Sequence, residues 1–426
     1  MPSRRAVVLS DLHLGPEGPL ATFRDCRALV ALLDGLAAPG DPPTELVLAG
    51  DIFDFLQTDA YDGFDPARAV DRFHAIVAGP QTAPVIAALR RFAARPGAEV
   101  TLLSGNHDPE MLLQPVREAF ELAIGRPGSV LYADDTPLAP GLGDRLPVWG
   151  HALGNDAGTV WIVHGDRWDT HNAIDRDALR RAVAGGHEFK LPVGSQLVYR
   201  VLSRLQPENR WIPELKPEFP VVVPLLLYLD PRITLPFLKE HWDLTARLLH
   251  DSINGRLHLG SLFGPEADAA PAPEAISDVE QILPSLLAEA LRAEAPADPG
   301  ALLRAWLLAS RWTERFQASN GSDGTVGAAH RWLPEALVAL IAGHTHGPRR
   351  RPADQPAYYN TGTWIPVGRF PQGDPKDIID AIEAGHWDAE APRTFATVEW
   401  DDGPPAVALW RCDAEGRREP VEGDGA

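Results

Sequence analysis

Short apolar runs alternate with helical patterns along much of this 426-residue chain. Aliphatic and β-branched runs without a polar break predict buried strands, and they lie at 6–9, 45–49, 99–103, 159–163 and 336–342. Amphipathic patterns predict helices at 22–36 and 66–95, the second interrupted near Gly79-Pro80. Strands that alternate with helices are typical of an α/β fold.

The pattern changes between residues 170 and 335. This stretch is rich in leucine and proline, and no apolar run in it leads into a polar turn. Helices are predicted near 236–250, 278–294 and 299–317, with a Gly/Ser-rich loop at 318–328. We therefore expect an inserted, mostly helical cap subdomain at 171–334.

Strand patterns resume after this segment. A strand-like stretch occupies 357–364, and 395–412 predicts a hairpin that turns at Asp401-Asp402-Gly403. Weaker strand-like pieces lie around Ser129 and Leu146. The predicted core is thus formed by 1–170 together with 335–415, and 416–426 is predicted to be a flexible tail.

The charge balance bears on the kind of partner. With 39 Lys+Arg against 59 Asp+Glu, the net charge is -20, which argues against a nucleic-acid partner.

Two cysteines are too few for a disulfide framework and suit a reducing cytoplasm. No cleavable apolar segment begins the sequence, and the apolar stretch 219–238 is interrupted by Asp230-Pro231-Arg232. We expect a cytoplasmic protein, with peripheral membrane contact left open.

Polar residues follow each of the five buried runs. Open α/β sheets place their ligands at the carboxyl ends of strands. The candidate metal ligands there are Asp11, His13, Asp51, Asn106, His164, His344 and His346. Carboxylate, amide and imidazole ligands without thiolates suit Mn, with Fe and Zn as alternatives, and argue against a structural zinc site. Seven ligands are too many for one ion that keeps an open coordination position. They suit two divalent ions that share one carboxylate ligand.

The ordered motifs resemble those of the calcineurin-like metallophosphoesterases. They are Asp11-x-His13, Gly50-Asp51-x-x-Asp54, Gly105-Asn106-His107-Asp108, His164-Gly165-Asp166 and Gly343-His344-x-His346. The resemblance implies an α/β/β/α sandwich. It also implies one metal on Asp11, His13 and His346, a second on Asn106, His164 and His344, and Asp51 bridging them. By the same resemblance, His107 would stabilise the phosphate or protonate the leaving oxygen, oriented by Asp108.

Within this superfamily the chain most resembles the branch that contains UDP-2,3-diacylglucosamine hydrolase. The first two motifs and the segment 360–364 carry this likeness. Two positions depart from it, since Asp54 stands where that enzyme tends to have Glu and His107 where it has Arg. The insertion is also far longer. The metal chemistry therefore carries over, whereas the lipid substrate does not follow.

These observations predict hydrolysis of a phosphate ester or pyrophosphate, on a phosphorylated small molecule or a lipid-linked substrate. A phosphodiester nuclease and a non-catalytic metal-dependent scaffold are the alternatives. The insertion leaves and re-enters the core beside metal ligands, so we expect it to roof the site, with oligomerisation or partner binding as the other interpretation. Asp169 and His171 are candidates for the rim of the site, with ordinary surface roles equally open.

Overall fold

The computed structural model describes residues 4–37, 42–58, 61–133, 150–169, 171–185, 188–214, 226–227, 229–241, 337–352, 354, 356–369, 380–381, 384–386 and 388–422. Contacts divide the chain into two compact units. The first contains Met1–Ser195, Thr325–Pro366 and Ala391–Ala426, and the second contains Gln196–Gly324 and Val367–Glu390. Both large sheets belong to the first unit.

The larger sheet has seven strands in the order β14-β13-β12-β1-β2-β3-β4. Strands β1 to β4 pair in parallel, and the C-terminal strands add an antiparallel meander beside β1. The bounds are β1 Arg4–Leu9, β2 Thr44–Ala49, β3 Ala98–Leu103, β4 Val130–Tyr132, β12 Thr394–Trp400, β13 Ala406–Cys412 and β14 Arg418–Pro420. Parallel pairing brings the carboxyl ends of β1, β2 and β3 to one edge of the sheet.

The smaller sheet has five strands in the order β5-β6-β7-β9-β8. Its central strands β6, β7 and β9 are parallel, and the outer strands β5 and β8 are antiparallel to their neighbours. The bounds are β5 His151–Asn155, β6 Gly158–Ile162, β7 Leu337–Ala342, β8 Arg349–Arg351 and β9 Ala357–Asn360. Strands β6 and β7 are therefore neighbours in this sheet although they lie far apart in the sequence.

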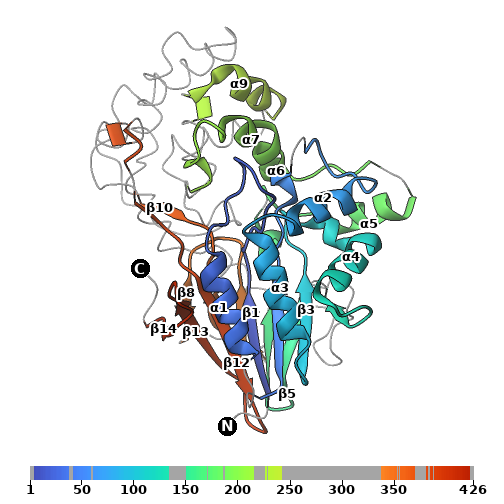
Figure 1. Cartoon of the computed structure of the whole chain (residues 1–426), viewed down its shortest axis with the longest axis vertical. Helices are drawn as coiled ribbons and strands as arrows, with labels where there is room; N and C mark the ends of the chain where they lie inside the picture. The colour runs from blue at the N-terminus through green and yellow to red at the C-terminus, as the bar shows by residue number, and fades with distance from the viewer. Residues whose placement is uncertain are drawn as a thin grey trace. The chain divides into compact units, whose positions relative to one another are not determined.

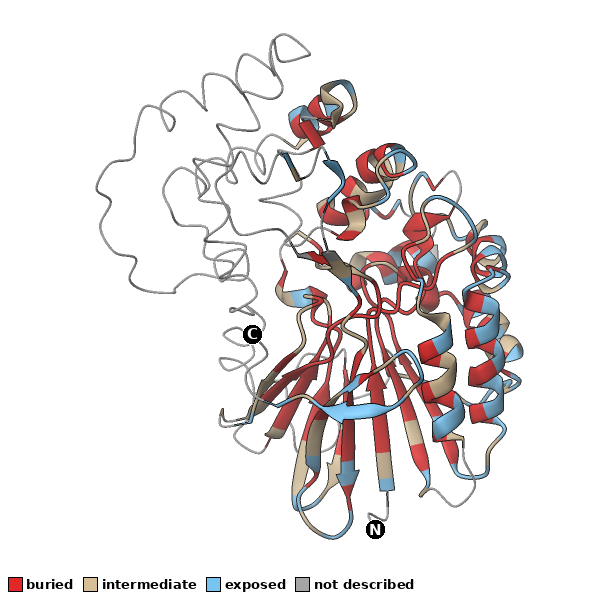
Figure 2. Ribbon diagram, turned by 60° about the vertical axis from the view of Figure 1, so that its left-hand side comes forward, coloured by how far each residue is buried: buried red, intermediate tan, exposed pale blue. Residues whose placement is uncertain are grey.

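The two sheets face each other across one apolar core. Side chains such as Val8 and Val47 from the larger sheet pack with Ile162 and Ile341 from the smaller one. Four helices lie along the other side of the larger sheet: α1 Cys26–Leu36, α2 Ala69–Val77, α3 Thr82–Ala93 and α4 Gln114–Ile124 (Figure 1). Their buried faces turn towards the strands and their exposed faces away from them (Figure 2). The predicted α/β sandwich is confirmed.

Most predicted elements of this unit appear close to their expected positions. The predicted break at Gly79-Pro80 separates α2 from α3, and the predicted C-terminal hairpin is β12 with β13. The first helix begins only at Cys26, and α4 and β5 were not predicted. Helix α4 did carry a signal, because its buried residues Val116, Phe120 and Ile124 are four positions apart. The strand-like piece at Leu146 lies outside the described residues.

Short helical turns follow three of the strands, β2, β3 and β6. They are η1 Phe55–Gln57, η2 Pro109–Leu112 and η4 Asp166–Trp168, and the last precedes helix α5 Arg176–Gly185. The first unit continues through α5 to Ser195, past the boundary at residue 170 that the sequence predicts. Residues 367–390, predicted as core, belong to the second unit.

The second unit has short elements in its described part. The boundary between the units falls within α6 Val193–Leu197. The elements of the second unit that follow are η5 Val198–Leu202, α7 Ser203–Leu205, η6 Ile212–Glu214, α9 Pro231–Glu240, β10 Val367–Arg369 and β11 Asp388–Glu390. Arg200 joins η5 to α9 through an ion pair with Glu240 at 2.5 Å. Helix α9 begins after Asp230, whose side chain caps it, and overlaps the helix predicted at 236–250 only over 236–240. Residues 242–250 lie outside the described residues. The helices predicted at 278–294 and 299–317 lie outside the described residues.

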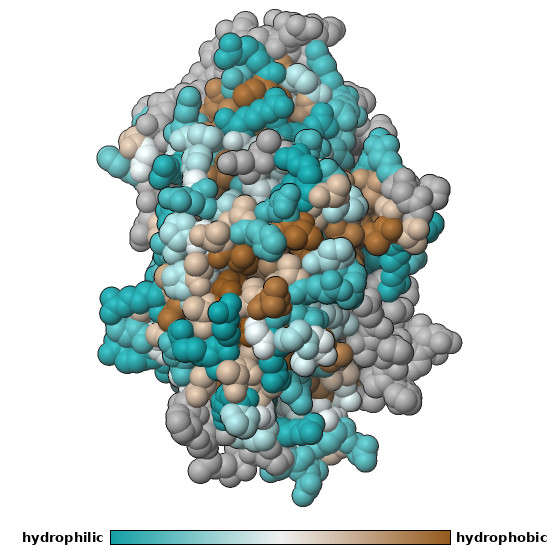
Figure 3. Space-filling view, turned by 45° about the vertical axis from the view of Figure 1, so that its right-hand side comes forward, coloured by the Kyte–Doolittle hydropathy of each residue, from teal (hydrophilic) through white to brown (hydrophobic). Residues whose placement is uncertain are grey.

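Large apolar side chains are mostly buried. On the face drawn in Figure 3, hydrophobic residues gather near the middle and hydrophilic residues surround them. Leu122, Leu131 and Val183 are the exposed large apolar residues of the described part, and side chains of this kind are ordinary on globular surfaces. In the part of the chain that is described, no helix is both long and apolar enough to cross a bilayer.

Candidate metal centre

The predicted ligands stand on loops with an uncommon backbone conformation. Six described non-glycine residues have positive φ, and five of them are predicted ligands: Asp11, His13, Asp51, His344 and His346. A left-handed backbone is costly for a residue with a Cβ atom and persists where the surrounding structure imposes it. Backbone bonds between loops impose it here, as when Asp11 N donates to Gly50 O and His13 N donates to Asp51 O.

One group of three side chains joins the ends of β1 and β7. Ligand atoms of Asp11, His13 and His346 lie close enough to one another to hold one ion, and all three residues are buried. The Nε2 atoms of His13 and His346 are 3.0 Å apart, and His346 Nε2 is 3.3 Å from Asp11 Oδ1. Adjacent ligands on an ion with bonds of about 2.1 Å are themselves about 3 Å apart. The spacing therefore fits a common ion.

A second group joins the ends of β2, β6 and β7. It contains Asp51, His164 and His344. His164 Nε2 is 3.3 Å from both Asp51 Oδ2 and Asn106 Oδ1, which adds the predicted amide ligand. Asp51 also belongs to a third group, with His13 and His107. Its carboxylate thus lies between the two halves of the centre.

The segment after β9 braces the loops that carry these ligands. The Thr363 hydroxyl donates to Asp11 O at 2.8 Å, and Ser10 Oγ contacts both the Asp11 carboxylate and Thr361 Oγ1. Asn360 Nδ2 donates to Gly343 O at 2.9 Å, next to His344. The bracing residues Ser10, Asn360, Thr361 and Thr363 are all fully buried, so these contacts are shielded from solvent.

Two glycines are required here by close approach of the backbone to ligands. A Cβ atom on Gly105 would lie 2.1 Å from Asp51 Oδ1, and one on Gly343 would lie 2.3 Å from Asp11 Oδ2. Neither has a positive φ, in contrast to Gly50 with φ 86.

The Gly105→Ala variant should therefore lose metal affinity and stability. Its new methyl group must displace the Asp51 carboxylate, and overpacking of this kind costs about 1–3 kcal/mol. The matched control is Gly347→Ala, because a Cβ atom there meets nothing within 4 Å. Titration with Zn²⁺ and chemical denaturation would measure both effects. Parent-like values for both variants would contradict the close approach.

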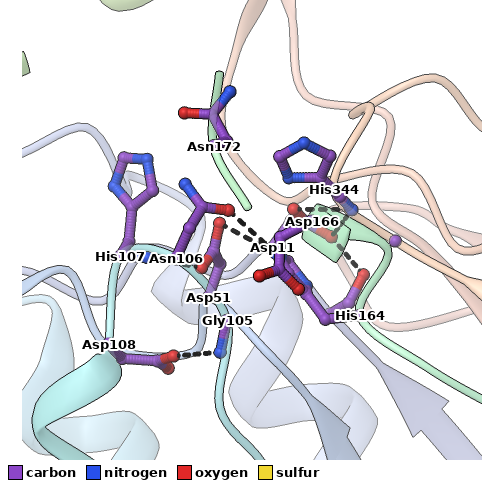
Figure 4. A network of polar contacts seen from close by, with 12 residues as sticks. Asp11, Asp51, Gly105, Asn106, His107, Asp108, His164, Asp166, Asn172 and His344 are labelled. Atoms are coloured by element: carbon purple, nitrogen blue, oxygen red, sulfur yellow. Dashed lines mark hydrogen bonds and ion pairs between the residues drawn. The ribbon is translucent and has the colours of Figure 1, made fainter. Parts of the chain in front are cut away.

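His107 contacts a carboxylate from another loop, Asp54. Asp108, expected to orient it, accepts backbone N–H groups from Gly105 at 2.6 Å and Ile52 at 2.9 Å. Figure 4 shows its carboxylate directed at Gly105 and away from the His107 ring. The carboxylate that contacts His107 is Asp54, whose Oδ2 is 3.0 Å from His107 Nδ1. Orientation of His107 by Asp108 stays a prediction, and Asp54 is a carboxylate that the structure brings to His107 Nδ1.

Asp54 contacts two histidines, His13 and His107, through the same oxygen atom. The same Oδ2 atom lies 2.9 Å from His13 Nδ1 and accepts a hydrogen bond from Gln57 Nε2 at 2.6 Å. Burial would raise its pKa, but His107 and then His13 outweigh burial and hold the pKa of Asp54 below its usual value. Asp54 therefore stays ionised and directs the Nε2 atom of His13 towards the first group of ligands.

Charges at the centre favour bound cations. Burial would raise the pKa of Asp51, but His164 and His107 hold it well below the usual value. Burial would lower the pKa of His164, but Asp51 raises it to about 10. At neutral pH, a proton on His164 then balances the carboxylate. A divalent ion must displace that proton, so metal binding is coupled to proton release.

Asp108 has the opposite shift. Burial, followed by the negative charge of Asp51, raises its pKa to about 7. Its backbone bonds to Ile52, Phe53 and Gly105 tie the loop after β2 to the loop after β3. Asp108 thus holds together the two loops that carry Asp51 and Asn106.

The donor set fits first-row divalent ions. Carboxylate, amide and imidazole atoms converge without a thiolate, and both described cysteines are free and lie elsewhere in the sequence. Each of the two groups has residue types and spacing that could hold a metal ion. The sequence-based reasoning missed the contacts of Asp54 and Asp169 with ligand histidines, although both acidic residues follow a ligand by a few positions.

Residues 4–206 match the model of the calcineurin-like phosphoesterase family. No curated protein matches the sequence. Similar solved structures include a putative 5'-nucleotidase from Staphylococcus aureus in complex with alpha-ketoglutarate, 14% identical with a TM-score of 0.29, over 99% of this chain and 55% of that one. They also include the phosphopantetheinyl hydrolase from Mycobacterium tuberculosis, 14% identical with a TM-score of 0.25, over 92% and 97%. The chain spans about half the length of the first.

The two-sheet fold gathers at its strand ends His and Asp groups that could hold metal ions. The match to the calcineurin-like phosphoesterase family model covers residues 4–206, just under half of the chain. The motif with His344 and His346 lies beyond the matched residues, and the smaller sheet brings it to the centre through β7.

Proposed function

We propose that this chain is a dinuclear metal-dependent hydrolase of a phosphate ester or pyrophosphate. The observation that carries the proposal is the place of Asp51. Its carboxylate is part of a ligand group with His164 and His344 and of another with His13 and His107. A carboxylate shared in this way is suited to bridge two ions.

In this proposal Asp11, His13 and His346 hold one ion, and Asn106, His164 and His344 hold the other. Mn is the favoured metal, with Fe and Zn as alternatives. When bound, two ions polarise a phosphoryl group and lower the pKa of the attacking water. The protein's part is to fix the ligand geometry, which the braced and buried loops do before any substrate arrives.

His107 is the residue proposed to act on the substrate. Its side chain is 13% exposed, more than that of Asp54 at 1%, so it lies at the accessible margin of the centre. Asp54 Oδ2 accepts from His107 Nδ1 and so orients the ring. The role proposed for this ring is to hydrogen-bond a phosphate oxygen or to protonate the leaving oxygen. The backbone N–H of His107 donates to Asp51 Oδ1 at 2.8 Å, which fixes its position relative to the bridge.

The substrate class proposed is a phosphorylated small molecule. A net charge of -20 gives no general attraction for a phosphate backbone, which makes a nuclease the weaker alternative. The nearness to the UDP-2,3-diacylglucosamine hydrolase branch, and with it a lipid-linked substrate, stays a prediction.

The test is a screen of metal-free protein reloaded with Mn, Fe or Zn. Substrates are an aryl phosphomonoester, a bis-aryl phosphodiester and a nucleoside diphosphate conjugate such as a UDP-sugar. We expect metal-dependent turnover of at least one class, abolished by a chelator and restored by the metal. Tight metal binding without turnover of any class would instead support the scaffold alternative.

A further inference from the structure

Asp169 contacts a predicted metal ligand from outside the ligand set. Its Oδ2 atom lies 3.1 Å from His344 Nε2, and the two side chains are 11% and 8% exposed. Asp169 directly follows η4, five positions after His164. The contact therefore joins the loop after β6 to the loop after β7.

The Asp169 carboxylate is held by further donors. The backbone N–H of His171 donates to Oδ1 at 2.8 Å, and Asn172 Nδ2 donates to Oδ2 at 2.7 Å. The acceptor that faces His344 is thus held in a fixed direction by two donors.

The loop that carries Asn172 is itself clamped. Gly194 N donates to His171 O at 2.8 Å, and a Cβ atom on Gly194 would lie 1.9 Å from Asn172 Oδ1. The next residue, Ser195, donates its hydroxyl to Asn106 O at 3.3 Å. Figure 4 shows Asn172 on the same side of the centre as the His344 ring. The chain thus returns to the centre at Ser195 and closes the loop around Asp169.

We propose that Asp169 is a positioning residue that selects the metal-binding form of His344. A neutral imidazole carries one proton, and a carboxylate oxygen that accepts at Nε2 keeps the proton there. Nδ1 is then left with a lone pair for the ion shared with Asp51 and His164. Partners of this kind orient histidine ligands and raise their basicity. The inference rests on the proposed function and extends it to the affinity of one of the two ions.

An amide cannot replace this carboxylate. Three donors, from His171, Asn172 and His344, share two acceptor oxygens. In an Asp169→Asn variant one of the two acceptor positions becomes an NH₂ group and faces a donor. If that group faces His344, it favours the tautomer with a proton on Nδ1, which blocks the metal.

The experiment compares Asp169→Asn, Asp169→Ser and Asp175→Asn with the parent protein. Serine keeps an acceptor for His171 N and so preserves the local turn, but it is too short to reach His344. Asp175 is the matched control, because it caps α5 by accepting from Ala178 N at 2.8 Å, and Asn caps equally well. Calorimetric titration with Zn²⁺ measures each site, and ¹⁵N spectra of histidine-labelled, Zn-loaded protein report which nitrogen of His344 is bound.

We expect one of two Zn²⁺ sites to weaken about 10- to 100-fold in both Asp169 variants, while the other site and the Asp175 variant stay at parent values. The Nδ1 signal of His344, assigned with a His344→Gln variant, should lose its metal-bound shift at Zn²⁺ levels that saturate the parent. Parent affinity at both sites with an unchanged Nδ1 signal in the folded Ser variant would overturn the inference. Failure of the proposed function would look different: without a dinuclear centre the parent itself would bind fewer than two ions, and without catalysis it would bind metal but turn over no substrate.

Discussion

The Asp51→Asn variant is expected to retain neither metal ion. Asp51 Oδ2 is 3.3 Å from His164 Nε2 and 4.0 Å from His13 Nε2, so one carboxylate serves both ligand groups. An amide has one oxygen acceptor and no charge, and it cannot bridge two cations. Loss of an outer partner alone costs about 10- to 100-fold in affinity or activity, and loss of a shared ligand should exceed that range. Elemental analysis after dialysis and the rate of aryl phosphate hydrolysis measure the effect.

The matched control is Asp34→Asn. Asp34 is exposed and pairs with Arg91 across α1 and α3, a kind of contact that contributes little. It should keep full metal content and activity. Two ions in the Asp51→Asn protein would contradict the proposed bridging role of Asp51. A single tight ion in the parent protein would contradict the dinuclear centre.

The His107→Ala variant is expected to keep near-parent metal content and to lose about 10²- to 10⁴-fold in kcat. That range is usual for a positioned acid–base group. Metal content is the decisive measurement, because the ring nitrogens of His107 lie close enough to His13 and Asp51 for His107 to be a metal ligand itself. A large loss of metal would make His107 a ligand and would overturn its assigned role.

Asp54→Asn is the informative comparison for His107→Ala. Asp54 contacts His107 Nδ1 at 3.0 Å and His13 Nδ1 at 2.9 Å. Its variant should therefore lower both kcat and the affinity for the ion on His13, whereas His107→Ala should lower kcat alone. Identical effects of the two substitutions on metal and on rate would mean that Asp54 acts through only one of its two histidines.

The sequence by itself determined the strands and the residue types at their ends. Runs such as 45–49 are apolar without interruption because both faces of a parallel strand are buried. The polar residues that follow these runs are then placed at the edge where the strands end. Local pattern is enough for this, and the described strands β1, β2, β3, β6 and β7 lie within one or two residues of the predicted runs. Helix α4 was missed even though its apolar spacing is helical.

The tertiary structure alone decided which polar group serves which ligand. Asp108 is next to His107 in sequence, yet its carboxylate binds backbone N–H groups, while Asp54 comes from 53 positions away to contact the ring. His344 receives Asp169 from 175 positions away. Residue type and spacing predict that carboxylates gather at these strand ends, but the partner of each histidine depends on which loops the two sheets bring together. That choice is made by strand order and backbone conformation, and neither is encoded in the neighbourhood of a single motif.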